Sequence, residues 1–392
     1  MSASIIVFSL IVIVLVLHDA FETMLLPRRI SRQFRFARSY YRCSWWLWAG
    51  VARRIRTVKR RNAFLSQFGP LSFLILISLW ASGLIVSFAC LHWAMGTPLR
   101  PAEEVSGLDA YLYMSGVVFF TLGFGDVTPA YPLGRFVTVV ETGLGFAFLA
   151  VVISYLPVLY QAFSHREVTI SLLDARAGSP PSAGQLLSRF ARYRKFDAFD
   201  YFLEQWEAWA AEVLESQVSF PLLSFYRSQH DNQSWLATMT VILDASALVI
   251  AGVKENDSYQ AQLTFAMARH AVVDLAQIYH IPPLEPAEDR MPLDDIRQLL
   301  TTLRNAGTEL REGDSAVRKL AELRQMYEPF VNALSRYFMV ALPPVVPKSV
   351  PVDNWQTSAW MRRTSGIGNL TPADSFDDHV DWSSTDRPSQ GV

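Results

Sequence analysis

The segment FFTLGFGDVTP, residues Phe119 to Pro129, combines residue types that could bind a dehydrated cation. Gly123 and Gly125 lack a Cβ atom and can adopt positive φ, so that successive backbone carbonyls can point in the same direction. Thr121 adds a hydroxyl group beneath them. Several such loops around one axis would form stacked rings of carbonyl oxygens that replace the water shell of an ion. The segment therefore predicts a path for cations, provided that other elements hold it at membrane depth.

The elements that must hold this loop are apolar segments on either side of it. Residues 71–93 form a run of 23 residues without a formal charge, which is long enough to cross a bilayer. Residues 133–163 form a second span, in which Glu141 is the only interior acid. The segment 108–120 between them is too short to cross, and we expect it to be a re-entrant pore helix. The negative end of its dipole would face a cation.

An outer helix, a short pore helix, a filter loop and an inner helix, in this order, resemble the two-helix pore module of bacterial potassium channels. The resemblance covers residues 71–163, and the residues that match the family's filter, 121–126, are Thr121, Leu122, Gly123, Phe124, Gly125 and Asp126. It implies a potassium-selective channel that binds potassium through the backbone carbonyls of Thr121, Leu122, Gly123 and Phe124. Each chain has one such loop, so a filter of four loops implies a homotetramer. No cofactor is expected besides the permeant potassium ions.

Three residues depart from the family's filter. Leu122 replaces the usual valine, and Phe120 stands where many members carry a second threonine. Phe124 replaces the usual tyrosine, so the hydroxyl hydrogen bond that braces the filter in that family cannot come from this residue. A weakly selective cation channel is therefore an alternative. Another alternative, from a different class, is a non-conducting membrane receptor or scaffold whose helical domain binds a partner.

The predicted inner helix contains candidate gating residues. Gly145 lies where the family has a glycine that acts as a hinge, and Gly143 is a nearby alternative. Pro157 removes one backbone hydrogen bond and clashes with the carbonyl of Ile153, so a bend is expected at residues 155–159. Two interpretations of Pro157 stay open. It is either part of a gate moved by the cytoplasmic domain, or a proline that only ends the membrane helix.

A further membrane helix is predicted at residues 1–26, before the pore module. Its first part is almost entirely Ile, Val and Leu, and its extension to Leu26 makes it long enough to cross. The basic residues that follow place its amino terminus outside the cell. A polar patch near its inner end consists of His18, Asp19 and Glu22. The sequence assigns no role to this patch or to Glu141.

Residues 27–69 form a basic and aromatic segment with twelve Arg or Lys residues and no Asp or Glu. We expect an interfacial helix on the cytoplasmic membrane surface. The basic residues expected to face lipid, which could be anionic, are Arg53, Arg54, Arg56 and Lys59. Four arginines recur every third residue, as in voltage sensors, namely Arg29, Arg32, Arg35 and Arg38. Only one apolar segment precedes them, however, so the bundle that a sensor needs is missing.

The remaining chain is predicted to be a cytoplasmic helical domain, residues 164–342, followed by a disordered tail, residues 343–392. From residue 165 onward there are 21 basic and 29 acidic residues, so a nucleic-acid partner is not expected. Trp235–Val253 is strongly apolar but has Asp244 at its centre, which favours a buried bundle helix over a fourth span. Pro, Ser, Asp and Gly dominate the tail without periodicity.

The helical domain carries no sequence signature that reveals its regulator. It contains no GxGxxG, P-loop or zinc-ligand spacing, which argues against an enzyme. Cys43 and Cys90 have no spaced partner and are interpreted as small apolar residues. The sequence thus predicts an all-α, multi-pass protein of the plasma (inner) membrane. It has an N-terminal helix, a two-transmembrane pore module with a re-entrant pore helix and filter loop, and a cytoplasmic helical domain.

Overall fold

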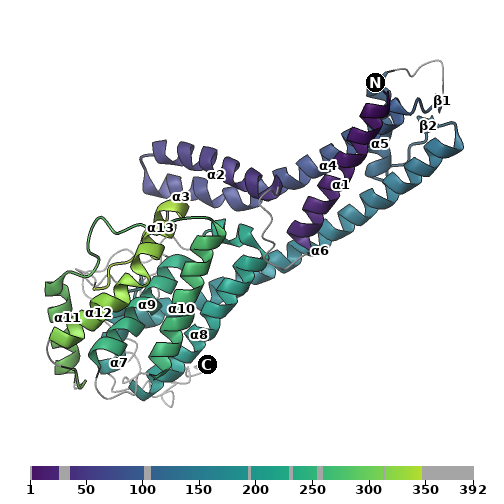
Figure 1. Ribbon diagram of the computed structural model, residues 1–392. Helices are drawn as coiled ribbons and strands as arrows, with labels where there is room; N and C mark the ends of the chain where they lie inside the picture. The colour runs from purple at the N-terminus through teal and green to yellow at the C-terminus, as the bar shows by residue number, and fades with distance from the viewer. Residues whose placement is uncertain are drawn as a thin grey trace, which may run out of the picture.

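The computed structural model describes residues 2–25, 36–100, 107–192, 196–228, 233–253, 259–306, 308–311 and 314–346. This part of the chain is almost entirely helical (Figure 1), which confirms the predicted all-α fold class. The helices are α1 (Ser2–Met24), α2 (Phe36–Arg54), α3 (Val58–Ser66), α4 (Phe68–Ala94), α5 (Leu108–Phe119), α6 (Pro132–Ala177), α7 (Ala183–Arg192), α8 (Phe196–Ser219), α9 (Trp235–Gly252), α10 (Tyr259–Ile278), α11 (Leu293–Asn305), α12 (Asp314–Gln325) and α13 (Glu328–Phe338). The other elements are the short 3-10 helix η1 (Pro221–Phe225) and the strands β1 (Leu99–Arg100) and β2 (Thr128–Pro129).

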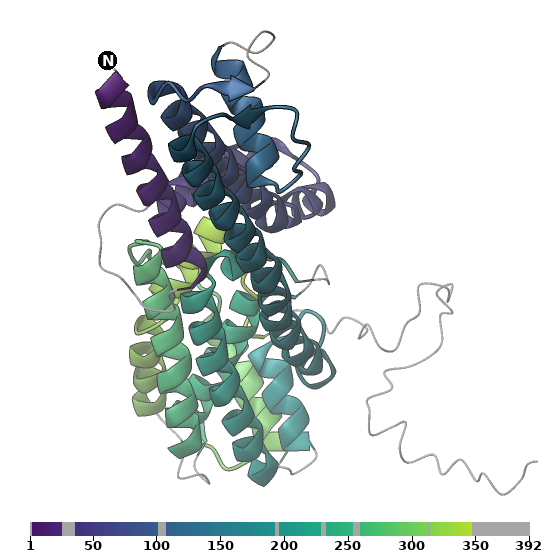
Figure 2. The ribbon, with the colours of Figure 1, turned by 90° about the vertical axis from the view of Figure 1, so that its right-hand side faces the viewer.

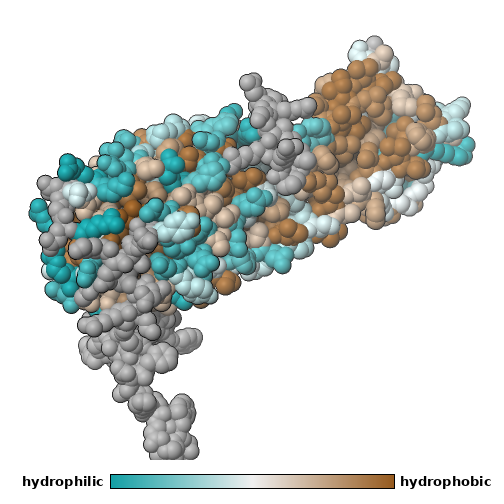
Figure 3. Space-filling view, turned by 60° about the horizontal axis from the view of Figure 1, so that its bottom comes forward, coloured by the Kyte–Doolittle hydropathy of each residue, from teal (hydrophilic) through white to brown (hydrophobic). Residues whose placement is uncertain are grey.

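The molecule is elongated, with α1 and the pore module at one end and a bundle of the later helices at the other (Figure 1). Helices α1, α4 and α6 each contain a stretch that is long and apolar enough to cross a membrane. Large apolar side chains on them face outward; Leu74, Phe146 and Ile153 are 54%, 68% and 69% exposed. Hydrophobic surface gathers at this end, whereas the surface of the bundle is largely hydrophilic (Figure 3). An exposed apolar surface of this kind needs lipid or a protein partner to cover it.

Helix α6 connects the two ends of the molecule (Figure 2). It has 46 residues and continues through Pro157, so the interpretation that this proline ends the membrane helix is wrong. The predicted end at residue 163 is also too early. Beyond that residue, Ile170 and Leu173 are buried in the core of the helical bundle. This packing outweighs the local cost of a proline inside a helix.

Helix α9 lies at the centre of the helical bundle. All of its 18 residues are buried, and α8, α10, α12 and α13 pack around it. By length and composition alone it could cross a membrane. Its complete burial among other helices confirms the prediction of a bundle helix at residues 235–253 rather than a fourth span.

Helix α2 carries the aromatic residues of the basic segment, and its faces have different surroundings. Trp45 is buried against Phe68 of α4 and Phe225 of η1, with ring centroids 4.9 and 5.0 Å away. Its indole Nε1 donates to Tyr337 O at 3.1 Å. The next residue, Trp46, is 69% exposed. The segment is therefore anchored to the outer helix and to the bundle, while another face stays free for the predicted membrane surface.

The helical domain ends later in the chain than predicted. Val345 is fully buried, and its carbonyl accepts the N–H of Gly184 at 2.8 Å. A Cβ atom on Gly184 would lie 2.9 Å from this oxygen, so glycine permits the close approach. Residues 343–346 thus belong to the domain, and the prediction that the tail begins at 343 is wrong. The rest of the predicted tail, 347–392, lies outside the described residues.

Candidate functional site

The predicted filter loop follows α5 and has an alternating backbone conformation. Positive φ angles occur at every second residue: 54° at Thr121, 66° at Gly123 and 75° at Gly125. Glycine adopts this region readily, whereas a β-branched threonine is an outlier there, and sequence reasoning missed it. The side chains of Leu122 and Phe124, between these residues, are exposed by 55% and 66%. The alternation lets successive carbonyls face one side, as a carbonyl-lined cation path requires.

Hydrogen bonds to α5 hold both ends of this loop. At its start, the N–H of Leu122 donates to Val117 O at 2.9 Å. At its end, the Tyr113 hydroxyl donates to Asp126 Oδ2 at 2.6 Å. The bond from Tyr113 lowers the pKa of Asp126 below its ordinary value; desolvation opposes this shift, and the N–H of Val127 adds to it. The pore helix therefore supplies a hydroxyl brace, although the loop's own aromatic residue cannot.

A two-stranded antiparallel pair joins the segments on either side of the pore helix and loop. In this pair, Leu99 of β1 lies opposite Pro129 of β2, and Arg100 lies opposite Thr128. At the start of α6, Arg135 Nε donates to Pro129 O at 3.3 Å. These contacts connect the chain before α5 directly to the chain after the loop, and so limit how far the loop can move.

The two glycines predicted to act in gating have different surroundings. A Cβ atom on Gly145 would lie 2.2 Å from Phe119 O, at the end of α5. At Gly143, no atom of the described residues lies within 4 Å of such a Cβ. Gly145 therefore lets the inner helix pack closely against the pore helix, a role that the sequence did not predict. Gating at either glycine stays a prediction.

Glu141 is completely buried where α4, α5 and α6 meet. Its Oε1 forms a hydrogen bond with Ser115 of α5, and its Oε2 lies 4.0 Å from Nε2 of His92 in α4. Ser115 and His92 are buried as well. We call these three residues the Glu141 cluster. Both partners are far from Glu141 in the sequence. Only the length and order of the apolar segments could have suggested that these three residues lie together.

The polar patch of α1 connects this helix to two others. Asp19 Oδ2 accepts the indole N–H of Trp80 in α4 at 3.0 Å and the backbone N–H of Ala37 in α2 at 3.2 Å. His18 Nε2 lies 3.7 Å from Glu22 Oε1, and both acids of the patch are buried. The patch therefore holds α1 beside the outer helix and the start of α2, apart from the filter loop.

The basic residues predicted to face anionic lipid are all exposed, namely Arg53, Arg54, Arg56 and Lys59. Arg53 and Arg54 end α2, Arg56 lies in the connection to α3, and Lys59 is in the first turn of α3. Their exposure leaves them available to a membrane surface, and the contact itself stays a prediction. Of the regularly spaced arginines, Arg29, Arg32 and Arg35 lie outside the described residues.

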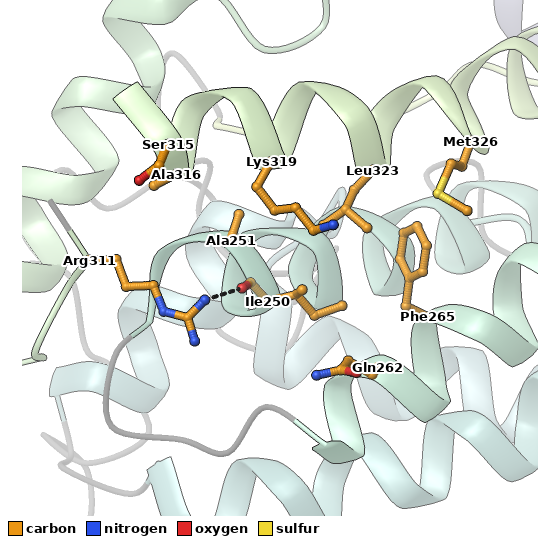
Figure 4. A pocket seen from close by; sticks show the side chains of 10 residues that line it. All are labelled: Ile250, Ala251, Gln262, Phe265, Arg311, Ser315, Ala316, Lys319, Leu323 and Met326. Carbon is orange, nitrogen blue, oxygen red and sulfur yellow. Dashed lines mark hydrogen bonds between the residues drawn. The ribbon is translucent and has the colours of Figure 1, made fainter. Parts of the chain in front are cut away.

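A pocket of about 610 Å³ lies in the helical domain between α12, the end of α9 and the start of α10 (Figure 4). Its apolar lining includes Phe265, Leu323 and Met326. Its two cations have partners within the protein. Arg311 donates to Ile250 O at 3.2 Å, and Lys319 Nζ lies 3.6 Å from Glu322. In the described ranges, no group of His, Cys, Asp or Glu is arranged to hold a metal ion.

Comparison with known families identifies the region around the filter loop. Residues 74–161 match the model of a family described as ion channel. The matched residues run from α4 through α5 and the loop into α6. The chain is therefore an all-α membrane protein with an ion channel pore domain, in agreement with the two-helix pore module expected from the sequence.

Similarity to another membrane protein extends beyond this domain. The chain is 27% identical over 307 residues to the uncharacterized membrane protein YdjJ of Bacillus subtilis (strain 168), covering 76% of this chain and 86% of that protein. An alignment of this length is longer than the matched pore segment, so the sequence similarity extends beyond the pore domain. No solved structure matches the chain.

Proposed function

We propose that the protein is a homotetrameric, potassium-selective channel that conducts ions passively through the loop from Thr121 to Gly125. The observation that carries this proposal is the positive φ at alternate residues of the loop. The loop also lies within the segment that matches the ion channel family. In this arrangement, carbonyl oxygens of residues 121–124 would replace the water around a potassium ion.

Four copies are needed because each chain contributes one loop to such a filter. The surfaces that neighbouring copies would cover are exposed in the single chain. They include the side chains of Leu122 and Phe124 and, on α6, Val139 and Phe146. Exposed large apolar side chains of this kind support contacts with other subunits or with lipid.

Selectivity for potassium is supported by the hydrogen bond from Tyr113 to Asp126. This bond fixes the end of the loop, which compensates for the missing hydroxyl group of Phe124. A weakly selective cation channel is the alternative outcome, and the reversal potential with potassium and sodium on opposite sides of a membrane separates the two.

Gating by the helical domain is supported by its attachment to α6. Arg166 donates to Leu223 O at 2.9 Å and to Tyr226 O at 3.0 Å. A movement of the bundle would therefore be transmitted to the inner helix. The places where this helix could respond are Gly143, Gly145 and Pro157, the last with its expected bend.

The proposed setting is the plasma membrane, with the amino terminus outside and the helical domain in the cytoplasm. The basic residues at the end of α2 would lie beside anionic lipid. Ion channel domains are generally non-enzymatic, and we infer no catalytic role for this protein. Its cytoplasmic regulator is a separate question.

The test of this function is conduction by the purified full chain in lipid vesicles. We expect potassium flux from the wild type and none from Gly123→Ala or Gly125→Ala, because a Cβ atom opposes positive φ at both positions. Both variants are expected to remain tetrameric by cross-linking. Gly50→Ala is the matched control, since no atom of the described residues lies within 4 Å of its added Cβ.

Unchanged potassium flux in either filter variant would contradict the assignment of the loop. A wild type that is tetrameric but does not conduct would favour the membrane receptor or scaffold.

A further inference from the structure

The Glu141 cluster places an acid inside the membrane part of the pore domain without a nearby cation among the described residues. Glu141, Ser115 and His92 are each 0% exposed. The charged or titratable group that faces Glu141 is His92 from α4, whereas α5 contributes only the Ser115 hydroxyl. Acids inside a membrane are costly, and are retained where they have a function.

The hydrogen bonds around Ser115 indicate which form of Glu141 fits this site. Ser115 Oγ lies 2.9 Å from Ile85 O of α4 and also within hydrogen-bond distance of Glu141 Oε1. A serine hydroxyl has one hydrogen to donate but can also accept. Both contacts can therefore be hydrogen bonds only when Glu141 supplies a proton to Ser115, while Ser115 donates to Ile85.

The position of His92 agrees with a neutral cluster. Its Nε2 is 4.0 Å from Glu141 Oε2, which is too far for a hydrogen bond. Its other nitrogen lies 3.3 Å from Thr97 Oγ1. Among the described residues, neither Nε2 nor Oε2 has a hydrogen-bond partner. An ion pair in this place would bury two charges without the hydrogen bonds that stabilise them, at a large cost.

We propose that Glu141 is a protonated positioning residue: it donates to Ser115, Ser115 donates to Ile85 O, and this chain of hydrogen bonds fixes the pore helix between α4 and α6. The close contact of Gly145 with Phe119 O holds the end of the same helix. The pore helix is then held at two places just before the filter loop. The effect on ion selectivity rests on the proposed channel function, whereas the protonation of Glu141 does not.

Infrared spectroscopy of the full chain in lipid tests the protonation directly. We expect a carbonyl stretch of a protonated carboxylic acid at neutral pH that disappears in Glu141→Gln. The control is Glu167→Gln, because Glu167 pairs with Arg166 at 3.0 Å and should not contribute to this band. A band that is absent, or that survives in Glu141→Gln, would overturn the proposal whether or not the protein conducts.

Conduction tests the positioning role with two variants of similar size. The amide that Glu141→Gln introduces can still donate to Ser115, so this variant should keep the potassium over sodium permeability ratio. Leucine fills the space without a hydrogen bond, so Glu141→Leu should lower this ratio by up to about tenfold, the scale of one lost hydrogen bond, in a tetramer as heat-stable as the wild type. Thr138→Val is the control, because its hydroxyl bonds only to Gly134 O within α6.

A ratio unchanged in Glu141→Leu, or lowered equally in Glu141→Gln and Glu141→Leu, would overturn the positioning role of the protonated acid. Absence of conduction in the wild type would instead contradict the channel function, and the infrared result would still stand.

Discussion

The pore domain and the helical domain each bury an acid within an apolar stretch of helix, and the partners of the two acids differ. In the helical domain, Asp244 of α9 is bound by Arg290, whose two terminal nitrogens donate to the two carboxylate oxygens at 3.1 Å each. Tyr327 adds a hydroxyl hydrogen bond at 2.5 Å. In the pore domain, Glu141 meets a serine and a distant histidine instead.

The surroundings of these acids fix their charge. Burial opposes the charge of Arg290, but the attraction of Asp244, together with Tyr327 and Glu328, raises its pKa above the ordinary value. Arg290 Nε also lies 3.2 Å from Glu328. The network in the bundle is thus ionic and holds helices together, whereas the Glu141 cluster, as we propose, is neutral and orients one helix. On this proposal, a buried acid serves stability in the bundle and geometry in the pore domain.

The largest change in stability should come from breaking the ionic network around Asp244 in the bundle. Arg290→Met leaves Asp244 as a buried charge without its cation, which should lower the free energy of unfolding of the bundle by about 3–5 kcal/mol. Hydrogen exchange at α9 in the full chain measures this loss. The permeability ratio of the assembled channel should not change.

The control for this prediction is Arg297→Met. Arg297 pairs with Asp294 on the surface, where the two side chains are 76% and 90% exposed, and the expected loss is about 0–1 kcal/mol. Equal exchange at α9 in the Arg290 variant and the wild type would show that the network does not stabilise the bundle.

A smaller loss of stability is expected from disturbing the close packing of α6 against α5 at Gly145. In Gly145→Ala the added methyl group meets Phe119 O, and overpacking of this kind costs about 1–3 kcal/mol. The pore helix must shift, so we expect reduced potassium flux. Gly50→Ala in α2, where the added Cβ meets no neighbouring segment of the described residues, is the control and should conduct like the wild type. Flux from Gly145→Ala equal to that of the wild type would contradict the packing role of Gly145.

The smallest expected effect concerns the brace at the end of the filter loop. The pKa of Asp126 lies below its ordinary value because Tyr113 donates to it, so the bond is present at neutral pH and is lost as the pH falls through that lowered pKa. Tyr113→Phe removes the donor and lets the pKa rise. Because no brace is then left for acid to break, the variant should carry less current than the wild type at neutral pH. The fall in current that acid causes in the wild type should be weaker in the variant. Superimposable pH profiles of current would show that Asp126 does not brace the loop.

Much of the pore domain was predictable because its signals are local. The lengths of the apolar runs gave α4, α5 and α6, and the glycines at 123 and 125 indicated the positive φ angles that the loop adopts. Asp244 at the centre of an apolar run correctly indicated a helix buried in the bundle. In each of these cases, a short stretch of sequence contains the physical cause of the structure that forms there.

The missed features depend on contacts between distant segments. Nothing near Asp19 in the sequence indicates Trp80 as its partner, and Trp45 and Trp46 are identical residue types of which only the first is buried. Pro157 predicts an interruption locally, but burial of Ile170 and Leu173 carries the helix onward. Residues distant in sequence decide these outcomes, so periodicity could not reveal them.

If the bundle moves α6 as we propose, and the helix stays straight, the contact between Gly145 and Phe119 would be the point about which α6 tilts. At about 1.5 Å per residue, its arm from Gly145 to Ala177 is about 48 Å long. A tilt of about 5° about this point would displace Ala177 by about 4 Å, Pro157 by about 1.6 Å and Glu141 by only about 0.5 Å. In the proposed channel, such a tilt would move the end of α6 in the bundle several times farther than the residues of α6 that pack beside the filter loop.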